Sequence, residues 1–165
     1  MREISIEKLT LNIGVGEPGA KLEKSQKLLE AISGMKAVQT KAKKRIPTWK
    51  LRPGLAIGTK VTLRGKKAEE LLKRLFASRD NSLKRSSFDN AGNLSFGITE
   101  YISIPGAEYD ASIGIIGLEA NVTFQRPGYR IRRRRLNKCA IPKKHIITQE
   151  EAINHVSEKY GVTVI

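Results

Sequence analysis

The segment TKAKKRIPTWKLRPGLAIGTKVTLRG, residues 40–65, decides the fold. Its second half alternates between the two sides of an extended chain, with Ile57, Thr59, Val61 and Leu63 opposite Gly58, Lys60, Thr62 and Arg64. Side chains alternate with a period of two along a β-strand. The pattern therefore predicts a strand over 56–64 with one apolar face and one polar, basic face.

The first half of the same segment is a loop that carries positive charge and no acid. Its six cations are Lys41, Lys43, Lys44, Arg45, Lys50 and Arg52. Like charges without a compensating acid repel one another, so a bound polyanion explains this loop better than solvation alone. Trp49 has two open interpretations: it stacks on a nucleic-acid base, as Tyr101 could also do, or it anchors the loop to the core.

Further strands and helices are predicted on either side of this segment. In 4–15, Lys8, Thr10 and Asn12 alternate with apolar side chains. If 4–15 and 56–64 are neighbours, their polar faces form one surface. A capping box, Thr148 with Glu151, predicts the start of a helix. Periodicity gives strands over 4–15, 38–40, 56–64, 93–104, 113–125 and 162–165, and helices over 22–33, 66–78 and 148–160.

Alternating strands combined with amphipathic helices predict an α+β fold. We expect a mostly antiparallel sheet with helices packed on one face, leaving an open polar and basic face flanked by basic loops. Residues 1–165 are interpreted as a single RNA-binding domain. In it, 126–147 forms a basic extension and 148–165 supplies a C-terminal helix and a short strand.

The charge balance of the chain favours a polyanionic partner. Lys and Arg number 31 against 16 acidic residues among 165, a net charge of +15. Nucleic acid is the first candidate, and an acidic membrane surface is the competitor. The sequence has no apolar run of membrane-spanning length, and its N-terminus, MREISIEKLT, lacks the apolar core of a signal peptide, so we expect a cytosolic protein.

Two further segments are candidates for RNA contact. The span 126–144 holds nine basic residues and no acid, and the planar guanidinium of arginine suits phosphate. The polar stretch 79–93 is long for a passive connection, which favours a functional loop. The additional RNA contacts expected in the first of these are Arg126, Arg130, Arg132, Arg133, Arg134 and Arg135.

Catalysis and cofactor binding have no support in the sequence. The G-x-G-x-x-G spacing at 14–19 is interpreted as a simple turn, because Glu17 would repel a pyrophosphate and the preceding strand alternates. The lone Cys139 and two histidines form no zinc set. A nucleic-acid-processing enzyme would need a metal-binding carboxylate cluster, whereas Asp80, Asp89 and Asp110 are scattered. We expect no enzyme, metal or cofactor.

Five segments resemble the ribosomal protein L5 family, which binds 5S rRNA. They are LTLNIGVGE (9–17), TKAKKRI (40–46), IGTKVTLRG (57–65), SFDNAGNLSFGI (87–98) and YDASIGIIGLE (109–119). They occur in the order and at the spacing of the family, and the resemblance runs over most of the chain. The C-terminal part, from RPGYRIRRRR to GVTVI, resembles the archaeal and eukaryotic branch, and the short N-terminus favours the archaeal type.

The resemblance implies a structural constituent of the large ribosomal subunit in the cytoplasm. It would bind 5S rRNA through the open side of the sheet and the adjoining loops, and help attach the 5S particle in the central protuberance. Asn12 and Thr62 match family positions that touch this RNA, whereas Met35 stands where the family usually has Gln. The expected 5S rRNA-binding residues are Asn12, Lys41, Lys43, Lys44, Arg45, Lys50, Arg52, Lys60, Thr62 and Arg64.

The resemblance also implies contacts beyond 5S rRNA. The family's long loop reaches P-site tRNA and corresponds to about 78–89 here, although the bacterial PRIRDFRG pattern is missing. The candidate tRNA contacts are Arg79, Lys84 and Arg85. Large-subunit rRNA, ribosomal protein L18 and a protein of the small-subunit head complete the expected partners.

Overall fold

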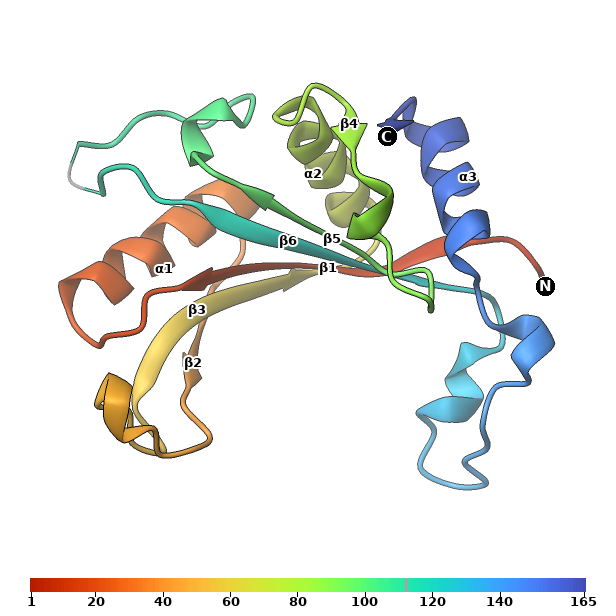
Figure 1. Ribbon diagram of the computed structural model, residues 1–165, viewed down its shortest axis with the longest axis horizontal. Coiled ribbons are helices and arrows are strands. Elements are labelled where there is room, and N and C mark those ends of the chain that lie inside the picture. Colours follow the sequence, from red (N-terminus) through yellow and green to blue (C-terminus); the bar gives the residue numbers. More distant parts are fainter. Residues whose placement is uncertain (112) are drawn as a thin grey trace. The chain divides into compact units, whose positions relative to one another are not determined.

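The computed structural model describes residues 1–111 and 113–165 (Figure 1). Short 3₁₀ helices cover Pro47–Trp49, Arg85–Ser87, Tyr101–Ser103, Tyr129–Arg132 and Lys143–His145. The strands and α-helices are, in chain order, β1 (Ser5–Gly14), α1 (Ala20–Ser33), β2 (Val38–Lys41), β3 (Ala56–Leu63), α2 (Lys66–Ala77), β4 (Ser82–Leu83), β5 (Leu94–Ile98), β6 (Leu118–Gln125), α3 (Gln149–Tyr160) and β7 (Thr163–Val164).

Five of the strands form one sheet in the order β2-β3-β1-β6-β5. The sheet is mostly antiparallel; β2 and β3 pair in this way, with Val38 opposite Lys60. β4 and β7 form a separate parallel pair. The predicted α+β fold is confirmed, and so is the predicted adjacency of strands 4–15 and 56–64, since β1 and β3 are neighbours.

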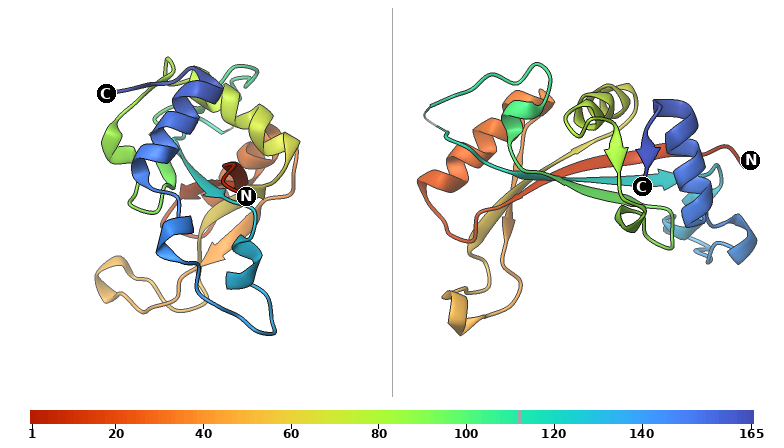
Figure 2. Two further views of the ribbon diagram at one scale, coloured as in Figure 1. Left: turned by 90° about the vertical axis from the view of Figure 1, so that its right-hand side faces the viewer. Right: turned by 45° about the horizontal axis from the view of Figure 1, so that its top comes forward.

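The chain divides into two compact units. Unit 1 comprises Met1–Leu9, Arg64–Phe96 and Asn121–Ile165, and unit 2 comprises Thr10–Leu63 and Gly97–Ala120. In unit 2, α1 lies along β3 and buries Leu22, Leu28, Leu29 and Ile32. The loop between β2 and β3 extends away from α1 beyond the ends of both strands (Figures 1 and 2).

The core of unit 1 is built from α2, α3 and β5. Phe76 of α2 stacks on Phe96 of β5 at a centroid distance of 5.6 Å and meets the edge of Tyr160 of α3 at 5.5 Å. The predicted capping box begins α3: Thr148 accepts a hydrogen bond from the Glu151 amide, and Glu151 accepts one from the Thr148 amide. Gly161, at a left-handed φ of 67°, ends the helix.

Two predicted strands are shorter than expected. β5 ends at Ile98, where 93–104 was predicted, and β6 begins at Leu118, where 113–125 was predicted. The prediction that the strand continues through Tyr101 is wrong, because the chain turns into a 3₁₀ helix there and Tyr101 is only 1% exposed. Its hydroxyl accepts a hydrogen bond from the Asp110 amide at 3.0 Å.

Candidate nucleic-acid interface

Four polar side chains of unit 2 stay accessible on the neighbouring strands β1 and β3. Lys60 is exposed, and Thr10, Asn12 and Thr62 are half-buried. They alternate with the buried Leu11, Ile13, Val61 and Leu63. An amide, two hydroxyls and an ammonium are groups that hydrogen-bond to ribose hydroxyls and base edges and that pair with phosphates.

Asn12 is held by a residue that the sequence reasoning did not single out. Its Nδ2 donates a hydrogen bond to Oε2 of Glu119 at 3.3 Å, and Glu119 stands on β6, the other neighbour of β1. The bond uses a donor of the amide and leaves its carbonyl oxygen to accept from a ligand. The available signal was the alternation of Glu119 with the buried Leu118 and Ala120.

The basic loop connects β2 and β3, and backbone hydrogen bonds across it give it a defined conformation. Backbone hydrogen bonds pair Ala42 with Leu55 and Ile46 with Leu51, at 2.8–3.1 Å, and the side chains of Ala42 and Leu51 are buried. The 3₁₀ helix Pro47–Trp49 forms the tip. Within the described ranges none of the six predicted cations, Lys41, Lys43, Lys44, Arg45, Lys50 and Arg52, is ion-paired, and all six are exposed.

The structure decides the two aromatic interpretations. Trp49 is 69% exposed, so the expectation that it anchors the loop to the core is wrong. Tyr101 is buried and hydrogen-bonded, so it has no ring face to offer to a base. Trp49 is therefore the aromatic side chain of the basic loop that is free to stack on a ligand.

Lys8 and Arg64 belong to unit 1. There the carboxylate of Glu7 forms ion pairs with two arginines. Glu7 Oε1 lies 3.8 Å from Nη1 of Arg64 and 2.5 Å from Nη1 of Arg133. Arg64 also donates to the backbone oxygen of Glu7 at 3.4 Å. Its side chain remains 60% exposed, so solvent and ligands still reach the guanidinium.

The segment 78–89 is more ordered than a plain loop. Asp80 and Asn81 turn the chain at left-handed φ values of 52° and 50°, and β4 then pairs with β7. The Arg85 amide donates to the Ile165 oxygen at 2.8 Å. The predicted tRNA contacts Arg79, Lys84 and Arg85 are all exposed, and Arg85 makes a weak surface pair with Glu150 at 3.7 Å.

Arg126, which was predicted to contact RNA, is buried and makes hydrogen bonds within the chain. It is 4% exposed, its Nη2 donates to Glu151 Oε1 at 2.7 Å, and its Nη1 donates to the His145 oxygen at 3.3 Å. Hydrogen bonding from the Thr148 amide and from Arg126 lowers the pKa of Glu151. The expectation that Arg126 contacts RNA from an open surface is wrong, because its guanidinium joins 126 to the start of α3.

The other arginines of the basic extension are exposed, and hydrogen bonds from Tyr129 hold the extension in place. The Tyr129 hydroxyl donates to the His145 oxygen at 3.1 Å and accepts from the Ile147 amide at 3.0 Å. Arg133 is engaged by Glu7, and Arg134 donates to the Asn137 oxygen at 2.7 Å. The accessible arginines of the predicted set are Arg130, Arg132, Arg133, Arg134 and Arg135.

One segment of the chain has the opposite character, and the sequence reasoning overlooked it. From 86 to 125 the sequence contains no Lys or Arg. In unit 2, Tyr109 and Ile115 of this segment are 59% and 65% exposed, and its acids Glu100 and Glu108 are exposed as well. Exposed apolar side chains among acids are typical of contact with protein and unfavourable for contact with phosphate.

The described part of the chain lacks two features that mark other protein classes. None of its helices combines the length and the apolar character that crossing a bilayer requires. No cluster of three or more His, Cys, Asp or Glu side chains is placed to hold a metal ion there.

Known families and proteins resemble this chain over its whole length. The model of the family described as "Ribosomal protein L5" matches residues 1–52, and the model of the C-terminus of the same ribosomal family matches 56–161. The "Large ribosomal subunit protein uL5" of Nanoarchaeum equitans is 52% identical, over 100% of this chain and 98% of the relative. Proteins of the same description from Sulfurisphaera tokodaii and Nitrosopumilus maritimus are each 48% identical, over 100% and 99% of this chain and 94% and 95% of the relatives.

Proposed function

Because the chain belongs to the ribosomal protein L5 family and is a structural, non-enzymatic constituent of the large ribosomal subunit, we propose that it binds 5S rRNA through the strand faces and basic loop of unit 2. Its place is the ribosome in the cytoplasm. The relatives are archaeal, in agreement with the archaeal-type resemblance.

The observation that carries this proposal is the combination of two kinds of group in unit 2. Asn12, Lys60 and Thr62 supply accessible hydrogen-bonding groups on β1 and β3, and the loop supplies six exposed, unpaired cations within the described residues. Cations bind phosphates regardless of sequence, whereas hydroxyls and amides discriminate ribose and base edges. Met35 is 38% exposed and cannot supply the polar contact of the usual Gln.

The same proposal assigns further RNA contacts to unit 1. Arg79, Lys84 and Arg85 are exposed on a segment pinned by β4 and β7, which suits contact with P-site tRNA. Arg130, Arg132, Arg134 and Arg135 face solvent in the basic extension and suit large-subunit rRNA. Together with 5S rRNA binding, these contacts would attach the 5S particle in the central protuberance.

Protein contacts are assigned to the exposed acidic and apolar residues of unit 2. Ribosomal protein L18 and a protein of the small-subunit head are the partners proposed for the chain. Tyr109, Ile115, Glu100 and Glu108 offer apolar area and negative charge to a basic protein.

The test is binding to 5S rRNA, to tRNA and to an unrelated RNA duplex across a salt series. We expect a preference for 5S rRNA that persists as salt rises, and a loss of that preference in Asn12→Ala and Thr62→Ala. Thr99→Ala, an exposed threonine of unit 2 outside the strand faces, is the matched control. Equal binding of all three RNAs that disappears with salt would leave net charge as the whole explanation and contradict the proposal.

A further inference from the structure

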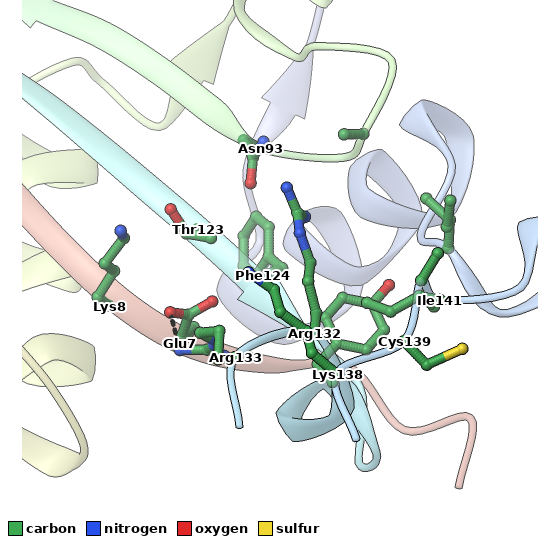
Figure 3. Close-up of a pocket in the computed structure, with 14 residues that line it drawn as sticks. Glu7, Lys8, Asn93, Thr123, Phe124, Arg132, Arg133, Lys138, Cys139 and Ile141 are labelled. Atoms are coloured by element: carbon green, nitrogen blue, oxygen red, sulfur yellow. Dashed lines mark hydrogen bonds and ion pairs between the residues drawn. The ribbon is translucent and has the colours of Figure 1, made fainter. Parts of the chain in front are cut away.

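A cationic groove lies in unit 1 between the end of β6 and the basic extension (Figure 3). Its volume is about 920 Å³, within the range of small-ligand sites. In Figure 3 the side chain of Arg132 extends from the extension toward Asn93, with Lys8 and Thr123 on the strand side and Lys138 at the opposite end. We call this the extension groove.

The extension groove has a surplus of positive charge. Lys8, Arg132, Arg133 and Lys138 line it, and Glu7 is the acid among its lining residues. Glu7 is already neutralised by Arg133 and Arg64 and is 13% exposed. Lys8, Arg132 and Lys138 have no ion-pair partner within 1–111 and 113–165. Three cations are therefore left to bind an anion from outside.

The walls of the groove suit a flat, partly apolar group next to that anion. Ile141 and Ile146 supply apolar surface, and the Thr123 hydroxyl and the Asn93 amide supply hydrogen-bonding groups. Asn93 Nδ2 is already bound to Asp89 at 2.7 Å, which fixes the orientation of its amide. A nucleotide combines these features, because it joins a phosphate to a flat ring with polar edges.

The groove is pre-shaped, because its outer wall is tied to the body of unit 1. The Cys139 amide donates to the Ile131 oxygen at 3.2 Å, which closes the loop of the extension on itself. Tyr129 joins that loop to Ile147 at the start of α3, and Arg126 joins the end of β6 to Glu151. A pre-formed site avoids part of the ordering cost of binding.

We propose that the extension groove binds one unpaired nucleotide of an RNA, with its phosphate on Lys138, Arg132 and Lys8 and its base against Ile141 and Ile146. This inference rests on the proposed role in rRNA binding and deepens it. A paired duplex cannot enter such a pocket, whereas a bulged nucleotide is unstacked and free to leave the helix. Readout of one extruded nucleotide would fix the register of the protein on its RNA.

The test uses two RNA hairpins that differ by one bulged nucleotide. The full-length protein should bind the bulged hairpin roughly tenfold more tightly than the paired one, because only the bulged nucleotide can enter the groove. Lys138→Ala should abolish that preference. Lys143→Ala removes an exposed cation of the same extension that does not line the groove, and should weaken both hairpins alike.

Cys139 gives a second readout, because it is the single cysteine of the chain, is exposed, and lines the groove. At matched saturation, the bulged hairpin should slow alkylation of Cys139 by iodoacetamide and the paired hairpin should not. Thr123→Val, which removes only a hydroxyl from the wall, should reduce the protection without changing the melting temperature.

In the binding experiment, equal affinity for the two hairpins or an unchanged preference in Lys138→Ala would overturn the inference. In the alkylation experiment, it would be overturned if free uridine monophosphate protected Cys139 more strongly than the bulged hairpin. Equal protection of Cys139 by a polyglutamate peptide would overturn it as well. The 5S rRNA salt series in the same variants separates this inference from the proposed function. Retained 5S preference without bulge preference would overturn the groove assignment alone.

Discussion

At the scale of single residues, the pairing of Asn12 with Glu119 predicts different effects for two substitutions. Glu119→Ala removes the acceptor that holds the Asn12 amide, so discrimination of 5S rRNA from tRNA should fall severalfold. Glu119→Gln keeps an acceptor and removes a charge that repels phosphate, so discrimination should persist and affinity should rise slightly. Competition binding checks both. Equal discrimination in the two variants would contradict a positioning role for Glu119.

Trp49 carries a second prediction at this scale. Because its side chain is 69% exposed, Trp49→Ala should leave the unfolding midpoint unchanged. If the ring stacks on a base, the same change should weaken RNA binding by about 1–3 kcal/mol, and Trp49→Phe should restore most of the loss. Filter binding measures the RNA affinity of all three proteins, and quenching of the single tryptophan when RNA is added to the wild type provides a second readout. A destabilised Trp49→Ala protein with normal RNA affinity would reverse the assignment.

The exposure of a single residue can be predicted from the sequence where it depends only on neighbouring residues in the chain. The alternation along 56–64 was enough to separate the accessible Lys60 and Thr62 from the buried Val61 and Leu63. Arg126 could not be separated from the other arginines in this way, because its partner Glu151 is distant in sequence and appears only after folding.

At the scale of elements, Gly58 shows how closely β3 approaches its neighbours. A Cβ at this position would lie 2.8 Å from the Ile13 oxygen and 2.9 Å from Thr40 Oγ1, and the backbone oxygen cannot rotate away. Gly58→Ala should therefore destabilise the protein by about 1–3 kcal/mol. Gly97→Ala in β5 is the control, because nothing lies within 4 Å, and it should be neutral or slightly stabilising. Urea unfolding measures both, and equal costs would contradict the close approach.

The start of α3 makes stability depend on pH. Glu151 has a pKa below its ordinary 4.5, because the Thr148 amide and Arg126 favour its charged form. The stabilisation is present above pH 4.5 and is lost as the pH falls toward the lowered pKa. Glu151→Gln keeps the cap but leaves the Arg126 guanidinium without its carboxylate, so it should cost about 1–3 kcal/mol at pH 7.

That difference between wild type and Glu151→Gln should shrink as the pH falls below 4.5. Denaturant unfolding at several pH values measures it, with Glu150→Gln as the control, since Glu150 makes only an exposed pair at 3.7 Å. A difference that stays constant with pH would show that the carboxylate charge is not involved.

Periodicity also explains which elements could be predicted. The three helices and the strands β1 and β3 follow from local patterns, and they form nearly where expected. β4 could not be predicted, because Ser82 and Leu83 form a strand only by pairing with Thr163 and Val164. The end of β5 at Ile98 could not be predicted, because the contacts that bury the Tyr101 ring and bind its hydroxyl to the Asp110 amide appear only after folding.

At the scale of the whole molecule, the positive charge is divided among separate sites, and each site should contribute its own share of the salt dependence. Lys43→Ala should lower the slope of log affinity against log salt by roughly one unit for many RNAs alike. Lys36→Ala, an exposed cation of unit 2 outside the basic loop, should change it less. Filter binding across a salt series measures both slopes, and equal slopes in Lys43→Ala and wild type would place the loop outside the interface.

The parallel pairing of β4 with β7 has a consequence for the protein while it is being made. Thr163 is added roughly 80 residues after Ser82, which takes about 4–16 s at ordinary elongation rates. During that interval the segment carrying Arg79, Lys84 and Arg85 lacks the strand that fixes it. A nascent or prematurely released chain would thus expose these cations without a defined arrangement, and only a chain extending past Val164 could offer them as an ordered surface to the translation machinery.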